Sequence, residues 1–327
     1  MSHSALQHAT PAQQLQALLQ SAAIAPLDNL GWLRITGEDR VRWLNGMVTN
    51  SIQALAPGEG NYNFILSAQG RIQGDATAWV LEDAILLETQ SEAVPTLTIL
   101  LDRFIIMDDV ELAALENRAG LLLAGPQAAA LLQQLGLSDL PELSMQSSIF
   151  NGADVTAIHA HSPLIPRYEL WADATTITAI TSALAGATTV DPEALNTLRI
   201  LEGTPLYGTD IRDKELPQET NQTRALHFNK GCYLGQEIVE RIRSRGNVHR
   251  TFTGLRLEGD LPPAGTPLEA EGKAVGELTS VATIPLPDGP IQLALGYLRR
   301  EAIECRLPIT YPGGTATPAT APYNPYK

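Results

Sequence analysis

The sequence is poor in features that would mark a specialised class of protein. It has only two cysteines in 327 residues, Cys232 and Cys305, and their wide separation fits neither a disulfide framework nor a paired metal-ligand spacing. No apolar run approaches the roughly 18 residues that span a membrane, and the N-terminus lacks a basic region followed by an apolar stretch. We therefore expect a soluble, cytoplasmic protein with reduced thiols, no membrane contact and no resident metal.

Positive charge is also scarce. The chain has 22 Lys and Arg residues against 36 Asp and Glu, a net charge of −14 that repels phosphate backbones, so we do not expect broad nucleic-acid binding. One segment departs from this pattern because it gathers basic side chains: His227, Lys230, Arg241, Arg243, Arg245, His249 and Arg250. Such a run is either a solvated helix face or a binding site for an anion.

The order of patterns along the chain predicts an α+β fold. A length of 327 residues is enough for two or three structural units. Helical spacing at 11–23 and 38–48 is followed by short apolar runs with turn signals at 60–90 and by a helix at 92–107. A similar order of strands and helices returns over 119–186, which indicates two related α+β units although no sequence repeat is visible.

The last part of the chain has a different pattern. Asp191 predicts the N-cap of a helix at 191–203. Further along, short alternating segments separated by Gly and Pro are typical of a small all-β barrel or sandwich. The final stretch, 311–327, has too little apolar content to hold itself in place, so we expect it to be extended or packed along the surface. We place a core domain at 1–249 and a barrel domain with an extended tail at 250–327.

The stretch "NKGCYLGQEIVERIRSRG", residues 229–246, is the strongest candidate for chemistry. Only the thiolate of a cysteine is strongly nucleophilic, and neighbouring cations or a helix N-terminus raise the thiolate fraction. Cys232 has both kinds of neighbour, since Lys230 and His227 precede it and a helix is expected from Gly235 onward. The alternative is a small buried side chain at a turn.

The residues around Cys232 resemble the Lys-Gly-Cys-Tyr-x-Gly-Gln-Glu signature of the YgfZ folate-binding proteins, a branch of the glycine-cleavage T-protein superfamily. The matching positions begin at Lys230 and Cys232 and continue along the motif: Gly231, Tyr233, Gly235, Gln236, Glu237, Arg241 and Arg245. Upstream, "LRILEGTPLYGTDI", "LPQETN" and "LSAQGRIQGDATAW" are similar to other segments of the superfamily. The resemblance therefore covers most of the chain.

This resemblance implies two intertwined α+β domains and a C-terminal β-barrel, arranged around a central hole that binds tetrahydrofolate or a one-carbon derivative. It also implies an accessory role in the assembly or repair of iron-sulfur enzymes, with Cys232 required. The implied partners are folate and iron-sulfur client proteins or their assembly machinery. Two cysteines cannot complete a four-thiolate cluster site, so any cluster would be shared or transient.

Other residues become candidate folate contacts through the same resemblance. Glu169 in "RYELWAD" resembles the strand glutamate that holds the pterin in T-proteins, where a carboxylate accepts from a ring N–H and an amine. Tyr62, Trp79 and Tyr207 are candidate aromatic walls for the ligand. The alternatives are an exposed glutamate on a half-solvated strand and aromatic residues of the core.

Asp75 bears on the choice between two branches of the superfamily. T-proteins that transfer an aminomethyl group carry an Asp-Asp pair on the corresponding hairpin, whereas this chain has Gln73, Gly74 and Asp75. One acid of the pair is therefore glycine, which favours the branch without transferase activity. Asp75 itself either faces the cofactor or only closes the hairpin.

These observations lead to one hypothesis with two rivals. Cys232 is predicted to be a reactive or sulfur-handling thiol beside a folate cavity. Lys230, Arg241 and Arg245 would keep it ionised or receive anionic partners, such as the glutamate tail of folate. The rivals are a tetrahydrofolate-dependent aminomethyl or methyl transferase, and a tRNA-modification-associated factor that binds RNA through the basic helix. Whether the protein turns over a substrate stays open at this stage.

Overall fold

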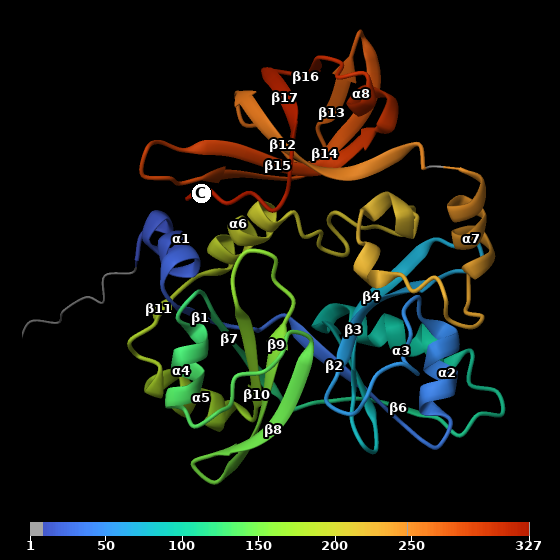
Figure 1. The fold of residues 1–327 in the computed structure, drawn as a ribbon, viewed down its shortest axis with the longest axis vertical. Coiled ribbons are helices and arrows are strands. Elements are labelled where there is room, and N and C mark those ends of the chain that lie inside the picture. Colours follow the sequence, from blue (N-terminus) through green and yellow to red (C-terminus); the bar gives the residue numbers. More distant parts are fainter. Residues whose placement is uncertain (1–8, 247, 327) are drawn as a thin grey trace, which may run out of the picture.

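The computed structural model describes residues 9–246 and 248–326, apart from the side chain of Arg245. Figure 1 shows two units of sheet and helix side by side, with a β-barrel above them. The predicted α+β class with a C-terminal barrel is confirmed.

The first sheet has five strands in the order β3-β4-β5-β2-β6. They are β2 (Leu30–Thr36), β3 (Gly60–Leu66), β4 (Ile72–Val80), β5 (Ile85–Gln90) and β6 (Glu111–Ala114). Helices α2 (Arg40–Met47) and α3 (Val94–Asp102) cover its outer face, where Leu44 and Leu97 belong to the same core as Ala76 and Ala78 of β4. Because side chains alternate along a strand, Asp75, Thr77 and Trp79, which alternate with these alanines, face the opposite, inner side of the sheet.

The second sheet has six strands in the order β11-β1-β7-β10-β9-β8. They are β1 (Ala23–Pro26), β7 (Ala119–Ala124), β8 (Ser144–Phe150), β9 (Ala153–Ala160), β10 (Arg167–Ala172) and β11 (Thr188–Thr189). Helices α4 (Ala128–Gln134) and α5 (Ala174–Ala183) cover its outer face, and α1 (Pro11–Gln20) and α6 (Pro192–Glu202) pack against part of its inner face.

The two sheets repeat one strand order. The order β3-β4-β5-β2-β6 of the first sheet corresponds to β8-β9-β10-β7-β11 of the second, with the N-terminal strand β1 inserted between β7 and β11. Strand β1 pairs with β7 antiparallel and with β11 parallel. The N-terminal segment therefore completes the second unit before the chain builds the first, which is the intertwining that the family resemblance implies.

The inner faces of the two sheets meet at a cluster of tryptophans. Trp32 and Trp79 come from the first sheet, and Trp171 comes from β10 of the second. The ring of Trp171 lies edge-on to both, with centroids 5.3 Å from Trp32 and 6.3 Å from Trp79. Such pairs add to the free energy gained from burial, so the cluster fixes how the two units face each other.

Helix boundaries follow the sequence signals in most places. Asp191 caps α6 as predicted, because its carboxylate accepts from the backbone N–H of Ala194 at 2.9 Å. The helix predicted over 92–107 is too long, since α3 ends at Asp102 and the carbonyl of Phe104 accepts instead from the indole N–H of Trp43. Among the described helices, none has both the length and the apolar character needed to cross a membrane.

The C-terminal barrel is closed, with the order β12-β15-β14-β13-β16-β17. Its elements are β12 (Arg250–Gly259), β13 (Pro267–Ala270), β14 (Lys273–Ile284), β15 (Ile291–Arg299), α8 (Arg300–Glu304), β16 (Ile309–Tyr311) and β17 (Gly314–Ala319). Part of the predicted extended tail forms the strand β17, which is held more firmly than its composition indicates. This strand pairs with β12 and β16, so backbone hydrogen bonds and ring closure hold it despite its low apolar content.

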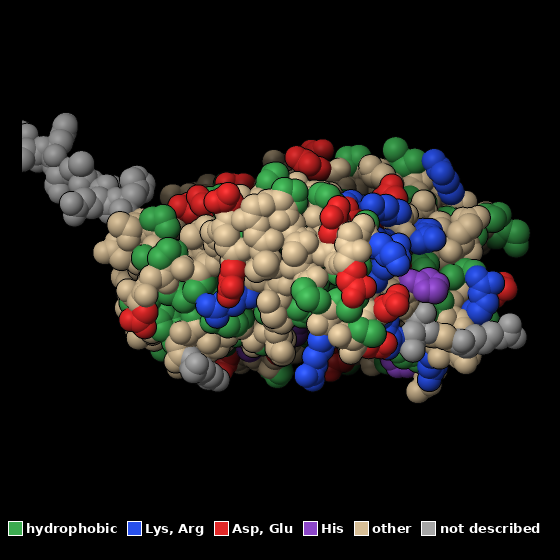
Figure 2. All heavy atoms as spheres, turned by 90° about the horizontal axis from the view of Figure 1, so that it is seen from above, with side chains coloured by type: hydrophobic (Ala, Val, Ile, Leu, Met, Phe, Trp, Pro, Cys, Tyr) green, Lys and Arg blue, Asp and Glu red, His purple; other side chains and the backbone are tan. Residues whose placement is uncertain are grey.

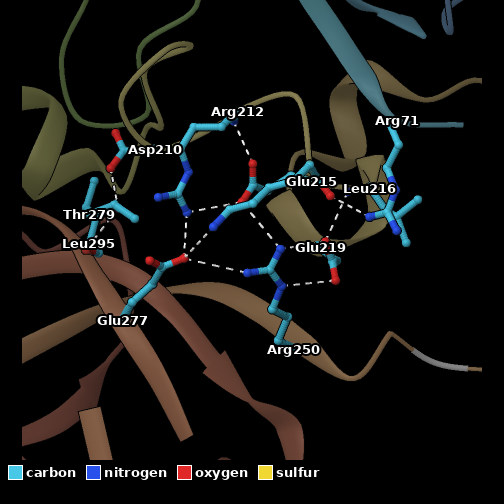
Figure 3. Close-up of polar contacts among 11 residues, drawn as sticks. Arg71, Asp210, Arg212, Glu215, Leu216, Glu219, Arg250, Glu277, Thr279 and Leu295 are labelled. Atoms are coloured by element: carbon cyan, nitrogen blue, oxygen red, sulfur yellow. Dashed lines mark hydrogen bonds and ion pairs between the residues drawn. The ribbon is translucent and has the colours of Figure 1, made fainter. Parts of the chain in front are cut away.

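An ion-pair network joins the barrel to the linker between α6 and α7 (Gln236–Arg245). Figure 3 shows Arg250 of β12 between Glu215 and Glu219 of the linker, with nitrogen–oxygen distances of 3.3 and 3.1 Å. Arg212 reaches from the linker to Glu277 of β14 at 2.6 Å. Glu215 is fully buried, and a buried carboxylate needs such partners, so the network fixes the barrel on the linker.

Candidate functional site

The cysteine loop, residues 229–235, places the thiol of Cys232 at the surface. Cys232 is exposed, whereas the next residue, Tyr233, is buried in a cluster with Tyr62 of β3. Gln236, the first residue of α7, accepts a hydrogen bond from the backbone N–H of Tyr233 at 3.3 Å. The alternative of a small buried cysteine is therefore wrong. The thiol is exposed, while its neighbour Tyr233 is held in the core.

Gly235 fits the cysteine loop against the β3–β4 hairpin. It has a φ of 82°, and a Cβ at this position would lie 2.6 Å from the carbonyl oxygen of Ser67. On the hairpin side, Gly70 has a φ of 70°, and a Cβ there would lie 2.7 Å from the Cβ of Ile238 in α7. Two glycines from distant segments thus allow a close approach of backbones, which explains the glycine of the Gly-Gln-Glu motif.

Lys230 anchors the same loop to the end of α2. Its ammonium group donates to the carbonyl oxygens of Asn45, Val48 and Asn50 at 2.6, 2.7 and 2.5 Å. Burial lowers the pKa of Lys230 to about 7, while carbonyl groups at a helix C-terminus favour the charged form. All three donors of the ammonium group thus bind backbone carbonyls, and the predicted role of Lys230 in keeping Cys232 ionised stays a prediction.

The basic side chains near Cys232 do not form a continuous positive surface. Arg250 belongs to the barrel network, and Arg243 pairs with Glu240 at 3.5 Å. Arg241 is exposed, and the side chain of Arg245 lies outside the described ones. Figure 2 looks onto the barrel end, where Lys and Arg side chains are interspersed with Asp and Glu on one side.

A second group of candidate residues meets between the two sheets. The hydroxyl of Tyr62 donates to Oδ2 of Asp75 at 2.6 Å, and the guanidinium of Arg224 lies over the Tyr62 ring, 4.2 Å from its centroid. Asp75 lies within β4 opposite Phe64 of β3, so it does not merely close the hairpin. Burial raises the pKa of Asp75 to about 6, and the hydrogen bond from Tyr62 opposes part of that rise.

Glu169 faces the same interior from the second sheet. It is 1% exposed, so the alternative of an exposed strand glutamate is wrong. Arg167 donates to its Oε1 at 2.9 Å, and the indole N–H of Trp171 donates to its Oε2 at 3.2 Å. All three residues lie on β10 at alternate positions, which places them on one face of the strand.

The predicted aromatic walls divide into different roles. Trp79 is 1% exposed within the tryptophan cluster, so its ring is core and the expectation of a free wall is wrong. Its indole N–H donates to Oε2 of Glu88 at 2.7 Å. Tyr207 is partly exposed, its hydroxyl donates to Asp213 at 3.0 Å, and its carbonyl accepts from the side chain of Gln90.

Two buried polar atoms near this interior have no partner among the described residues. They are the indole N–H of Trp32, from the tryptophan cluster, and the hydroxyl of Tyr297, from β15 of the barrel. Both residues are nearly fully buried, and buried donors normally bond to protein or to another molecule. The described residues contain no group of three or more His, Cys, Asp or Glu side chains arranged to hold a metal ion.

Sequence reasoning missed several members of this interior group. Glu88, Arg224 and Trp32 lie in no recognisable motif, whereas Arg167 and Trp171 flank Glu169 in "RYELWAD" but receive no role from the resemblance. For Glu88 the one available signal is its position two residues from Gln90 in a strand whose only other polar residue is Thr89. That spacing places two polar side chains on one face, and the fold shows that this face is the inner one.

Comparison with solved structures identifies the class of fold. The aminomethyltransferase T of the glycine cleavage system from Bartonella henselae superposes with a TM-score of 0.85. The match covers 96% of this chain and 89% of that one at 21% sequence identity. The fold is therefore that of a T-protein.

Comparison of sequences gives the family. Residues 3–230 match the model of the GCVT N-terminal domain, and residues 250–324 match that of the CAF17 C-terminal beta-barrel domain. The chain belongs to the GCVT family, and the resemblance to its YgfZ branch is confirmed.

Its relatives include proteins with different names. The tRNA-modifying protein YgfZ of Escherichia coli is 28% identical over 86% of this chain and 87% of that protein. An aminomethyltransferase of Streptomyces coelicolor is 28% identical, with coverage of 88% and 82%. A putative chloroplastic transferase of Arabidopsis thaliana is also 28% identical, with coverage of 89% and 68%.

Replacing Gly235 by alanine is expected to destabilise the protein. The new Cβ would meet the Ser67 carbonyl, and a positive φ strains any residue with a side chain, so we expect a loss of roughly 1–3 kcal/mol in the free energy of unfolding. Urea unfolding measures this change. Gly231→Ala is the matched control, since a Cβ at Gly231 has no neighbour within 4 Å. Equal stability of both variants would contradict the proposed packing.

Replacing Asp75 by asparagine is expected to stabilise the protein at high pH. The pKa of Asp75 is raised in the folded state, so folding favours the protonated acid. The corresponding stability is present below the ordinary pKa and is lost as pH rises through about 6. Asparagine does not ionise, so it avoids this loss. We expect the free energy of unfolding of Asp75→Asn to exceed that of the unaltered protein by up to about 3 kcal/mol at pH 8 and by little at pH 3.

Thermal or urea unfolding at both pH values gives the difference between the two proteins. Asp154→Asn on β9 is the control, because Asp154 is exposed. A gain that is the same at pH 3 and pH 8 would show that ionisation of Asp75 is not its cause.

Proposed function

We propose that the protein binds a reduced folate, tetrahydrofolate or a one-carbon derivative, between the inner faces of the two sheets. The observation that carries this proposal is the buried carboxyl group of Glu169, which faces the interior among indole and guanidinium groups. A pterin offers a ring N–H beside an exocyclic amine, and a carboxylate accepts from both in a bidentate manner. The unpaired donors of Trp32 and Tyr297 offer further partners to a polar ring.

Each interior residue has a distinct task in this proposal. Glu169 holds the pterin edge, and Arg167 keeps the carboxylate of Glu169 in place. Asp75 is the residue that would hold or release a proton beside the ring, because its pKa is raised to about 6 and Tyr62 orients it. A bound folate supplies a carrier for a one-carbon unit. The chain's own contribution is to bind it, orient it and limit its contact with water.

Packing around Gly74 argues against aminomethyl transfer by this chain. The acid pair of the transferases needs a side chain at this position, but a Cβ on Gly74 would lie 2.4 Å from Cδ2 of Leu97 in α3. The position also faces the outer core, where Leu97 lies, whereas its neighbour Asp75 faces the interior. We therefore favour a folate-binding protein without transferase turnover over the aminomethyltransferase that some relatives are named as.

The cysteine loop supports an accessory role. The thiol of Cys232 is exposed, so a partner protein can reach it. Its position is fixed because Tyr233 is buried and Lys230 makes three backbone contacts. We propose that Cys232 serves the assembly or repair of iron-sulfur enzymes, and that effects on tRNA modification, the role that names the YgfZ relatives, arise through such enzymes. Arg241 of α7 is also exposed and offers a cation to an anionic partner.

A folate titration tests the ligand assignment. Glu169→Gln keeps the shape of the side chain but weakens its acceptor, so we expect its affinity for tetrahydrofolate to fall about tenfold or more. Isothermal titration calorimetry under reducing, anaerobic conditions measures this change. Glu111→Gln, at an exposed position on β6, is the control. Absence of binding by the unaltered protein would refute the assignment.

The exposed thiol separates the two halves of the proposal. Cys232→Ala is expected to bind tetrahydrofolate as tightly as the unaltered protein, because Cys232 lies outside the interior group. In cells that lack the protein, the same variant should fail to restore the activity of a dependent iron-sulfur enzyme. Full restoration of that activity would refute the proposed accessory role of Cys232, but it would not bear on the proposal that the protein binds folate.

A further inference from the structure

A cleft of about 660 Å³ opens between the two sheets at the end away from the barrel. Gly152, in the turn between β8 and β9, lines this cleft, and Figure 1 shows that turn at the end of the molecule opposite to the barrel. Residues of both α+β units form the walls. The volume lies within the range of sites that bind small molecules.

The tryptophan cluster separates the cleft from Glu169. Along β10 the inner-face positions run from Glu169 to Trp171 and then to Asp173, which directly follows the strand and lines the cleft. Arg118 takes the equivalent place just before β7, because Ala119 is in register with Ala172. The cleft therefore begins beyond Trp171, on the side opposite to Glu169.

Arg118 brings a half-buried positive charge into this cleft. Its guanidinium lies 5.7 Å from the centroid of the Trp171 ring, and its Nη2 donates to Oγ1 of Thr156 at 3.3 Å. Among the described residues, no carboxylate lies within ion-pair distance of this guanidinium, whereas Arg167 and Arg199 have carboxylates at 2.9 and 2.8 Å. Burial lowers the pKa of Arg118, since no such partner offsets the loss of water.

The guanidinium of Arg118 has donors left for a ligand. It carries five N–H groups in a planar fork that matches the two oxygens of a carboxylate. The contact with Thr156 uses one of them, and the ring of Trp171 holds the group in place. Arg118 is thus arranged in advance for a planar anion, which lowers the cost of binding one.

A second arginine of the cleft already has its charge matched. Arg34 of β2 is in register with Leu86 of β5, which belongs to the tryptophan cluster, so Arg34 also faces inward. It pairs with Asp83 at 2.5 Å. Within the described part of the chain, Arg118 is therefore the cleft cation that lacks an acidic partner.

The other walls restrict the kind of anion that fits. Leu86 and Met145 are 2% and 8% exposed and give the cleft an apolar floor. Glu116 and Asp154 are exposed acids that also line it, whereas the carboxylate of Asp173 is held by backbone N–H groups at the start of α5. These acids repel ligands with several negative charges, and the floor favours an apolar body.

We propose that the cleft binds a small carboxylate with a single negative charge and an apolar body. The carboxylate accepts from the guanidinium of Arg118, and the body packs on Leu86 and Met145. The ligand is different from the proposed folate, and its site lies on the other side of the tryptophan cluster.

The test compares 3-phenylpropionate with 3-phenylpropan-1-ol, which has the same body without the charge. NMR titration of the isotope-labelled full chain follows the side-chain Nε–H signal of Arg118, identified by its absence from the spectrum of Arg118→Met. We expect 3-phenylpropionate to shift this signal saturably, with a dissociation constant of about 1 mM or tighter. The alcohol should bind about tenfold more weakly, because it lacks the charge-assisted hydrogen bonds.

Variants of the cleft assign the binding to Arg118. Arg118→Met keeps an apolar stem on Trp171 and should weaken binding of the acid about tenfold or more, whereas Arg118→Lys keeps the charge and should lose about threefold. Asp154→Asn removes a repelling charge and should tighten binding roughly twofold. Arg256→Met, at an exposed position of β12, is the matched control and should leave the affinity unchanged.

Three results would overturn the proposal. The first is a signal of Arg118 that does not shift saturably at up to about 20 mM of the acid. The second is equal affinity for the acid and the alcohol, or equal affinity of Arg118→Met and the unaltered protein for the acid. The third is loss of binding in Glu169→Gln, which would place the acid in the interior beside Glu169. Failure to bind tetrahydrofolate would refute the proposed function and would not affect this second site.

Discussion

The interior between the two sheets is the constraint on which the rest of the structure depends. Indole rings fill one part of it, and carboxyl and guanidinium groups fill another. Ionisable groups are costly to remove from water, so each must be held by a partner. Indole N–H groups hold Glu88 and Glu169, Arg167 neutralises Glu169, and Tyr62 holds Asp75. The barrel, fixed to the linker through buried Glu215, contributes the hydroxyl of Tyr297 from above.

The cysteine loop belongs to the same framework but faces outward. Gly235 packs on the hairpin whose strands carry Tyr62 and Asp75, and Tyr233 shares a buried cluster with Tyr62. Lys230 fixes the start of the loop to the end of α2 through three backbone carbonyls. A single hairpin therefore contacts the cysteine loop at its turn and presents Asp75 to the interior from its strand. This arrangement positions the exposed thiol and the polar interior group through the same hairpin.

Sequence patterns could predict the features that depend on interactions between residues close together in the chain. Asp191 caps a helix through its own backbone neighbours, and alternating segments bounded by glycine and proline form the barrel. Long-range contacts could not be predicted. Strand β17 depends on pairing with β12, and the carbonyl partners of Lys230 lie 180 to 185 residues away along the chain. Resemblance pointed to Glu169 and Asp75, but Glu88 becomes visible only when the two sheets are placed face to face.

The central claim is that a reduced folate binds between the inner faces of the two sheets. Hydrogen–deuterium exchange with and without 5-formyltetrahydrofolate tests it most directly, because bound ligand slows local opening. The account predicts slower exchange in peptides from β4, β5 and β10, with little change in the outer helices α4 and α5. Slowing confined to α7 and the cysteine loop, with those three strands unchanged, would contradict it.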